Sequence, residues 1–548
     1  MYLAPSLDPQ SQQKLADIKD RMGTLEKTLA RDVAKKPSVK SNGPGAVARG
    51  SSMFSEIKEE SSDEDAGEAD DLGFLVPSPL VSHDNVYQNG DDVDDELMDL
   101  GVQLGKMRIT ERVGGLVRPK LVQELTATLN EVTHDNPDGH ESHSAATDIQ
   151  DPREAYGNTH RLRAAPKGYL GPGPDYIAPA SSFYFPGTNI QTSLLDYLPS
   201  RYASDQLMSQ YWSSVHYICR CVHRPTFEAQ YQTFWDRITM GSEPSPPIQA
   251  IVFAAMFSAS VSMSGDQILQ QFGATKAALM DSLRSGTEMA LAKANFLRTT
   301  RVDTMQAFTM YLIPLCRAEV SRAHSALTGT AIRLAECMGL HRDGSHYGLS
   351  PVETHVRRMV WYQLCFLDMR TAMATGPRPS IRQDEFDTKL PLNVDDVDLL
   401  KPDPPMEDAE RFTDMTVSLI RMKCGEMNRS LNVDIAAVDR KKKSLQSVLV
   451  RIKKFRAKIS EQFLPILDDT IPLHYFASKV LFMNLEGYYI QSLHRYLFST
   501  AQRMPDRLRQ ILLGAGTLNM EAAVDIDMKP ELKPWAWCKY LWSTHSSN

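Results

Sequence analysis

The sequence predicts an all-α domain over residues 186–548, preceded by segments of a different composition. Helical apolar patterns follow one another through this region with short breaks, and no segment alternates convincingly as a strand would. Hydrophobic residues make up 42% of the 548 residues, which supplies a sizeable core. The longest apolar run, Ile248 to Met263, is interrupted by polar residues and is shorter than the roughly 20 residues that cross a bilayer. We therefore expect a buried helix there, and no contact with a membrane.

Residues 1–34 carry a short repeat typical of a dimerising coiled coil. Apolar residues recur there at alternating spacings of three and four, which places them along one seam. The candidate dimerisation residues are Leu15, Ile18, Met22, Leu25 and Leu29. Two heptads are few, and an isolated helix of this length is marginal in water. A single amphipathic helix packed on its own chain is therefore the alternative.

Residues 35–105 have the composition of a disordered acidic linker. From Ser51 to Gly105, sixteen Asp and Glu accompany one basic residue, Lys58. Two stretches, Asp70–Val81 and Asp91–Gly105, interleave acids with bulky apolar residues, as activation segments do when they fold into a coactivator groove. A solvating linker explains the same composition equally well.

Residues 106–185 are predicted to be a basic segment followed by a linker. The stretch Lys106–Lys120 is net basic, and we assign it no mechanism. His134, His140 and His143 lie further on, beside acidic residues, but no rigid element would hold them as metal ligands. We expect a flexible polar loop at these histidines.

The first helix of the domain is expected from Ser204. One face carries Leu207, Tyr211, Val215, Ile218 and Val222, the helix ends before Pro225, and Thr226 is a candidate cap for the next helix. Cys219, Cys221 and His223 are spaced like metal ligands, but no second ligand group follows them. We interpret these three residues as packing or capping residues.

Two further helices and the turn between them are expected within residues 327–375. The first has Leu327, Ala331, Leu334 and Met338 on its inner face and ends at Gly339. The second has Ser350 as its cap, Pro351 at its first position and Glu353 closing a capping box. Its apolar stripe consists of Val352, Val356, Val360, Leu364 and Leu367, and it stops before Gly376-Pro377.

A later helix pairs an apolar stripe with a basic face. The stripe consists of Leu445, Val448, Leu449, Ile452, Phe455 and Ile459. The candidate basic patch consists of Lys441, Lys442, Lys443, Lys453, Lys454 and Arg456. A solvated helix face is one interpretation of these cations, and nuclear import or phosphate contact is the other.

Several separated motifs resemble the regulatory domain of the fungal transcription factors whose DNA-binding domain is a six-cysteine binuclear zinc cluster. In chain order they are HRPTF at residues 223–227, GLHRD at 339–343, paired arginines and a Trp at 357–361, LDMR at 367–370, GPRPSI at 376–381 and LPLNVDD at 390–396. The resemblance covers most of residues 100–542. It implies an all-α regulatory domain, and a dimerising coil that follows a zinc cluster.

The zinc cluster of that family is not in this chain, because no cysteine precedes Cys219. We therefore expect no cofactor in this chain, and zinc only in a cluster supplied upstream or by a partner. At the other end, Trp535, Trp537, Tyr540 and Trp542 form a dense aromatic cluster. In the resembled family a similar segment leads into a further long helix, so we expect the domain to be truncated at its C-terminus.

An enzyme is the competing class, and its strongest support is the triplet His341-Arg342-Asp343, which matches the catalytic loop of protein kinases. The rest of the kinase signature is absent, including Asp-Phe-Gly and a Gly-rich loop. No nucleophile, base and oxyanion site occur together, so we expect a protein that is not an enzyme.

We therefore expect a nuclear transcriptional regulator of RNA polymerase II genes, such as a metabolic or biosynthetic set. Its expected partners are a second copy or another family member and a coactivator, with DNA bound only if a zinc cluster is supplied. The first alternative is a modulator without a cluster that dimerises with or titrates a complete family member. The second is a helical domain that senses a small molecule.

Overall fold

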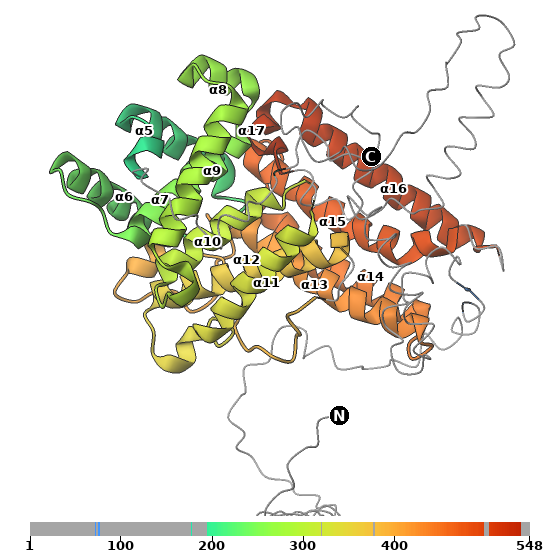
Figure 1. Ribbon diagram of the computed structural model, residues 1–548. Helices are drawn as coiled ribbons and strands as arrows, with labels where there is room; N and C mark the ends of the chain where they lie inside the picture. Colours follow the sequence, from blue (N-terminus) through green and yellow to red (C-terminus); the bar gives the residue numbers. More distant parts are fainter. Residues whose placement is uncertain are drawn as a thin grey trace, which may run out of the picture. The chain divides into compact units, whose positions relative to one another are not determined.

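The computed structural model describes residues 72, 75, 76, 177, 194–318, 320–375, 379–497 and 503–538. Within these ranges the regular elements are helices and there is no strand, which confirms the all-α prediction. Figure 1 shows the helices in chain order. The coiled-coil residues Leu15 to Leu29 lie outside the described part of the chain, as do nearly all of the acidic linker and of residues 106–185.

The helices fall into two runs separated by a long connection. The first run comprises α5 (Arg201–Gln210), α6 (Arg224–Thr239), α7 (Pro246–Ser262), α8 (Gly265–Phe272), α9 (Lys276–Lys293), α10 (Val302–Leu315), α11 (Arg322–Cys337) and α12 (Pro351–Thr375). The second comprises α13 (Thr416–Asp439), α14 (Leu445–Phe463), α15 (Pro472–Leu497), α16 (Asp506–Met528) and α17 (Lys533–Ala536). Short single turns are η5 (Leu194–Tyr197), η7 (Phe296–Arg298), η8 (Gly344–Tyr347), η9 (Asp396–Leu400), η10 (Leu464–Ile466) and η11 (Pro530–Leu532), and η6 (Tyr211–Val215) is a π-helix.

Helix α7 is the predicted buried helix. Every residue from Gln249 to Ser262 is buried, and α7 packs against α9, α10 and α5. Serines replace apolar residues at several of these positions, and their hydroxyls donate to helix carbonyls, as Ser258 does to Ala254 at 2.8 Å. None of the described helices is both long and apolar enough to cross a membrane.

Helices α11 and α12 have the predicted ends. Gly339 adopts the left-handed conformation (φ +73°) just after α11, and Ser350 Oγ accepts a hydrogen bond from the Glu353 amide at 3.2 Å. The apolar stripe expected on α12 is only part of its contact surface. Beyond its first turn, α12 also buries polar side chains on its other faces, among them Arg358, Gln363 and Asp368. It is therefore a central helix of the fold, and not a surface helix with one inner face.

The second run packs on α12 through α13, which contacts α14 and α15, while α15 contacts α16 along its length. Helix α14 buries Leu445, Val448, Ile452, Phe455 and Ile459, as its sequence predicts. Its charged face lies opposite this stripe.

One predicted cap is wrong. Helix α6 begins at Arg224, and its capping residue is His223, whose ring accepts from the Thr226 amide at 3.4 Å. Thr226 already lies in the first turn of α6. Its hydroxyl oxygen is 2.7 Å from His223 Nδ1, and the tautomer of the ring decides which of the two atoms donates. Imidazole can replace a hydroxyl here because its acceptor nitrogen reaches the same unpaired amides of the first turn.

Candidate functional site

The family-like motif GLHRD ends in a buried carboxylate that ties three segments together. The Asp343 side chain is fully buried and accepts two hydrogen bonds of 2.8 Å from the Arg358 guanidinium of α12. The same carboxylate caps η8 by accepting a hydrogen bond from the Ser345 amide at 3.2 Å. It also accepts a hydrogen bond from the Lys389 amide at 2.9 Å. The paired, two-point geometry is the strongest form of an arginine–carboxylate contact.

This arrangement explains the triplet that resembles a kinase loop. Burial raises the pKa of the Asp343 carboxyl, but the hydrogen bonds from Arg358, Ser345 and Lys389 outweigh burial and hold that pKa well below its ordinary value. His341 packs against the ring of Trp361, and Arg342 pairs with Asp387 at 3.2 Å. Each member of the triplet therefore has a structural partner, and Asp343 has no free lone pair aimed at a cleft to act as a base.

Hydrogen bonds to a buried carboxylate also join the motifs LDMR and GPRPSI. The Asp368 carboxylate of α12 accepts from the amides of Ser380 and Ile381 at 2.8 and 2.9 Å. Arg429 of α13 donates to the Ile381 carbonyl at 2.6 Å. Arg370 of α12 donates to the Ala318 carbonyl at 2.5 Å, beyond the end of α10. These contacts fix the chain that follows α12 against α12 and α13.

A third clamp joins the segment before HRPTF to LPLNVDD. Arg220 is fully buried, pairs with Asp396 at 2.6 Å and donates to the Asp414 carbonyl at 2.6 Å. The Arg224 amide donates to the other Asp396 oxygen at 2.6 Å, across 172 residues of sequence. Burial raises the pKa of the Asp396 carboxyl, but Arg220 outweighs burial and lowers that pKa to about 2. The family-like motifs are thus brought together as buried clamps.

The residues spaced like metal ligands belong to this clamp region. Burial raises the pKa of the Cys219 thiol to about 11, which keeps the sulfur protonated, and His223 contacts Thr226 and the Asp396 carbonyl through its two ring nitrogens. Across the described ranges, no group of three or more His, Cys, Asp or Glu side chains is arranged to hold a metal ion. These residues therefore do not fit a zinc ion.

The predicted basic patch is divided by the fold. Lys443 pairs with Asp434 at 3.0 Å, and Arg456 pairs with Glu486 at 2.7 Å. By contrast, Lys441 and Lys442 are exposed in the turn between α13 and α14, and Lys453 and Lys454 are exposed on α14. Four of the six cations thus face solvent, and two stabilise the packing of α14.

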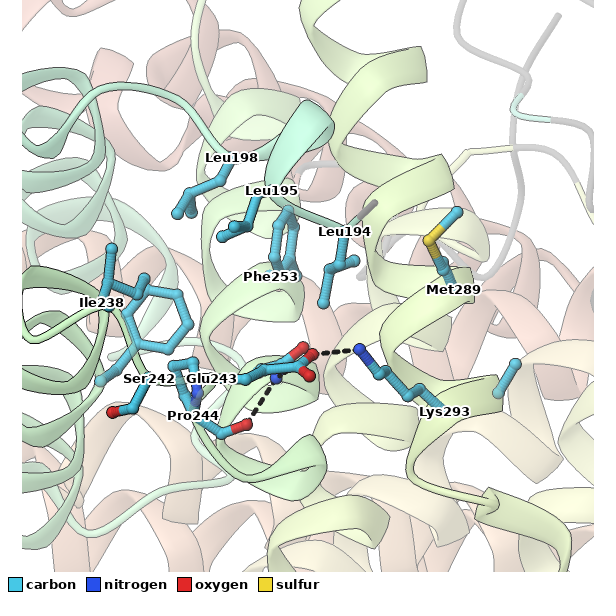
Figure 2. A pocket seen from close by; sticks show the side chains of 14 residues that line it. Leu194, Leu195, Leu198, Ile238, Ser242, Glu243, Pro244, Phe253, Met289 and Lys293 are labelled. Atoms are coloured by element: carbon cyan, nitrogen blue, oxygen red, sulfur yellow. Dashed lines mark hydrogen bonds and ion pairs between the residues drawn. The ribbon is translucent and has the colours of Figure 1, made fainter. Parts of the chain in front are cut away.

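A cavity that sequence reasoning missed lies among η5, α6, α7 and α9, with a volume of about 560 Å³. Its size falls in the range of small-molecule sites. Figure 2 shows the leucines of η5 and the ring of Phe253 on one side and the Glu243–Lys293 pair on the other. The lining residues are Leu194, Leu195, Leu198, Phe234, Ile238, Gly241, Ser242, Glu243, Pro244, Gln249, Phe253, Met289, Ala292 and Lys293.

The polar side of the cavity contains a charged pair. Lys293 donates to Glu243 and lowers the pKa of that carboxyl. Gln249 donates to Glu243 at 3.1 Å and to the Pro244 carbonyl at 2.5 Å. Both charged side chains are about half-exposed, so the pair lies at the rim of an otherwise apolar cavity.

The wall of the cavity depends on a glycine. A Cβ on Gly286 of α9 would lie 2.6 Å from a ring carbon of Phe253, closer than real Cβ atoms approach. Glycine therefore lets α9 approach α7 and places the Phe253 ring in the cavity wall. A glycine inside a helical pattern is the one sequence signal of this close contact.

Comparison with known proteins finds one matching domain model and several similar regulators. The model of the fungal specific transcription factor domain matches residues 208–470, a range that contains the three clamps. A C6 finger domain transcription factor of Aspergillus fumigatus is 29% identical over 44% of this chain and 35% of its own length. The aurofusarin cluster transcription factor of Gibberella zeae is 31% identical over 52% of this chain and 42% of its own length.

An uncharacterized transcriptional regulatory protein of Schizosaccharomyces pombe is 33% identical over 37% of this chain and 32% of its own length. The chain thus spans less than half the length of each of these curated relatives. Among solved structures, the K. lactis CBF3 core is similar with a TM-score of 0.45 at 12% identity, over 67% of this chain and 75% of that one, and this similarity is too distant to support a conclusion. Residues 208–470 match the fungal specific transcription factor domain, and the curated relatives that this chain is similar to are named as transcription factors or as a transcriptional regulatory protein.

Proposed function

We propose that this protein is a nuclear transcriptional regulator of RNA polymerase II genes and has no catalytic role. The observation that carries the proposal is the family match over residues 208–470. The fold supports it, because the motifs of that domain form buried clamps and its kinase-like triplet is committed to structure. Relatives named as transcription factors of biosynthetic clusters make a biosynthetic gene set the first candidate target.

A reporter assay tests this function. The full chain is fused to an unrelated DNA-binding domain and expressed with a reporter that carries the matching site. We expect the fusion to change reporter output by severalfold relative to the DNA-binding domain alone. Equal output at equal protein level, with the fusion in the nucleus, would count against a role in transcription.

Binding to DNA by this chain alone is expected to be weak and electrostatic. The exposed cations Lys441, Lys442, Lys453 and Lys454 supply phosphate contacts without reading bases. Affinity for any duplex would then fall steeply with salt, and replacing the four lysines by Glu would reduce it further. Sequence-selective binding at physiological salt would contradict this expectation.

The same four lysines are the candidate import signal. Fluorescence microscopy of the tagged full chain compares the lysine-to-Glu variant with the wild-type chain. We expect the variant to lose nuclear enrichment, and a charge swap at Lys533, an exposed lysine outside the patch, serves as the control. Dimerisation with a complete family member, which would make the protein a modulator, is tested by co-expression: a modulator lowers the output of its partner.

A second candidate function is the sensing of a small molecule, and the 560 Å³ cavity favours it. Its apolar walls and charged rim suit an amphipathic molecule with one polar end. Decanoate and decylamine are matched probes, because their polar ends carry opposite charges and compete for Lys293 or Glu243. We expect one of them to raise the melting temperature of the full chain, and Ile238→Trp, which fills the cavity, to abolish the rise.

A further inference from the structure

An apolar cluster lies where α14, α15 and α16 meet, at the end of the second run of helices. Its buried members are Leu445 of α14, Leu493 and Tyr496 of α15, and Met504, Leu508 and Leu512 in and just before α16. We call this set the α14–α16 cluster. Partly buried apolar residues of these helices and of α13 surround it.

Two leucines of the acidic segment pack against this cluster. Leu72 and Leu75 are each partly buried there, although the domain begins more than a hundred residues later. The Leu75 amide donates to the Leu72 carbonyl at 3.2 Å, so the backbone turns between these two leucines. Val76, the next residue, is 52% exposed and is not among the residues packed against the cluster.

Charge complements this apolar contact. Asp70 and Asp71 directly precede Leu72, within a segment whose acids outnumber its bases sixteen to one. The turn before Leu445 carries Lys441 and Lys442, both exposed. The charge of this segment in the sequence is therefore opposite in sign to that of the two exposed lysines before Leu445, and an attraction between such charges is strongest at low salt.

The acidic segment and the cluster belong to one chain, so a weak contact is sufficient to keep the segment on the cluster. Because the segment and the cluster belong to one chain, the segment is present at a high effective concentration. Two leucines and a few charges would bind poorly as a free peptide, yet they fill the cluster for most of the time when tethered. A contact of this strength also remains open to displacement.

We propose that the α14–α16 cluster is an intramolecular docking site for the acidic segment around Leu72 and Leu75, and that docking withholds these leucines from other proteins. The first part stands on the contacts alone. The second part rests on the proposed function, because it treats the acidic segment as an activation segment.

A binding experiment with the full chain tests docking. Replacing both leucines by Asp empties the cluster, and a fluorescein-labelled peptide of residues 66–81 then serves as the probe. We expect the peptide to bind the L72D/L75D chain at least about tenfold more tightly than the wild-type chain, whose cluster is already occupied. Val76→Asp is the control for added charge, since it places one of the two added charges at an exposed neighbouring position and leaves both leucines on the cluster.

Other results would overturn the proposal. Equal binding to both chains, or binding to neither at about 1 mM peptide, would mean that the cluster does not select this segment. A wild-type mass by light scattering that halves in L72D/L75D would mean that the occupant comes from a second copy. Lys441→Glu with Lys442→Glu, introduced into the L72D/L75D chain, is expected to weaken peptide binding severalfold, whereas Lys453→Glu with Lys454→Glu is not.

A reporter measurement tests the withholding step. Leu512→Ala enlarges the cluster without altering the acidic segment, and its melting curve shows whether the domain remains folded. In the DNA-binding fusion we expect higher reporter output from this variant at equal protein level. Unchanged output, alongside tight peptide binding in solution, would show that docking occurs but does not restrain the segment. If only the peptide-binding experiment fails, the docking site is refuted and the proposal that this protein regulates transcription is unaffected.

Discussion

The indole nitrogen of Trp535 donates a hydrogen bond of 3.0 Å to the backbone carbonyl of Ser213, across 322 residues of sequence. Ser213 lies in the π-helix η6, where the His216 amide bonds to the Tyr211 carbonyl at 2.9 Å. A π-turn shifts the helical bonding by one residue and frees carbonyls of the preceding turn. Trp537 donates to the next carbonyl, that of Ser214, at 3.3 Å. The last described helix therefore closes on the first turns of the domain.

Trp535→Ala is expected to destabilise the domain by about 3–5 kcal/mol, because a large buried ring and its hydrogen bond are both lost. Trp535→Phe keeps most of the packing against Phe476 and should cost about 1 kcal/mol for the hydrogen bond. Urea unfolding monitored by circular dichroism measures both. Equal costs for the two variants would mean that the hydrogen bond to Ser213 and not the packing dominates.

Acidification below pH 6.5 should destabilise the fold through buried histidines. Burial lowers the pKa of His324 to about 4 and of His355 to about 3, and it holds the pKa of His216 well below its ordinary value. The unfolded chain then binds protons that the folded chain does not, so stability is present above pH 6.5 and lost as pH falls toward 4. Each histidine contributes about 2 kcal/mol between pH 7 and pH 5.

Thermal unfolding across pH 5–7.5 checks this dependence. His355→Asn removes one titrating group and should flatten the curve by about a third, whatever its effect on stability at pH 7.5. A curve of unchanged slope in the variant would show that His355 titrates normally in the folded chain.

Arg358→Ala should cost about 3–5 kcal/mol, because it leaves the buried Asp343 carboxylate without its cation. Arg357→Ala is the control on the same helix, since Arg357 makes a partly exposed pair with Glu353 that is worth about 1 kcal/mol or less. Combining Arg358→Met with Asp343→Asn should recover part of the loss. Chemical unfolding of the four chains gives the comparison, and a double variant as unstable as Arg358→Ala would argue against charge burial as the cause.

Ile18→Asp with Leu25→Asp is expected to abolish dimers, because it places charge in the predicted coiled-coil seam. The melting of the helical domain should stay unchanged. Lys19→Asp changes charge outside the seam and should leave the dimer intact. Light scattering measures the mass of each chain, and a wild-type chain that is already monomeric would favour the single packed helix.

Helix α16 carries an exposed apolar face that should bind hydrophobic dye. Leu513, Met520, Val524 and Met528 are 55–74% exposed and recur at spacings of seven, four and four, on one side of the helix. Met520→Lys with Val524→Lys should reduce dye fluorescence by about half or more. Met240→Lys removes an isolated exposed methionine and should change little. Weak dye binding by the wild-type chain would show that this face does not attract apolar ligands.

Local signals were sufficient to predict much of the fold. Gly339, Ser350 and Pro351 set helix ends through backbone geometry and nearby hydrogen bonds, so neighbouring residues determine them. The apolar stripe of α14 was also predictable, because one face of that helix meets the domain and the other meets solvent. Burial of α7 followed from its composition.

Long-range partners account for what the sequence did not reveal. Arg358 and Asp368 fall on faces of α12 that a periodic pattern assigns to solvent, yet each is buried against a segment distant in sequence. His223 displaced Thr226 as a cap because its second nitrogen also binds the Asp396 carbonyl at 2.9 Å, a contact that only the folded chain creates. The cavity was not predictable, since four separate segments line it.

The clamps at Arg358, Asp368 and Arg220 have a genetic consequence. A substitution at Arg358 or Arg220 strands a carboxylate inside the protein, and one at Asp368 removes the acceptor of the Ser380 and Ile381 amides, so the damage grows with temperature and spreads through the whole domain. Alleles at these positions should therefore be temperature-sensitive and lower the amount of folded protein, while their transcripts remain normal. For the two arginines, suppressors would arise at the partner carboxylate, and a screen that scores only growth would mistake these scaffold positions for sites that recognise a ligand.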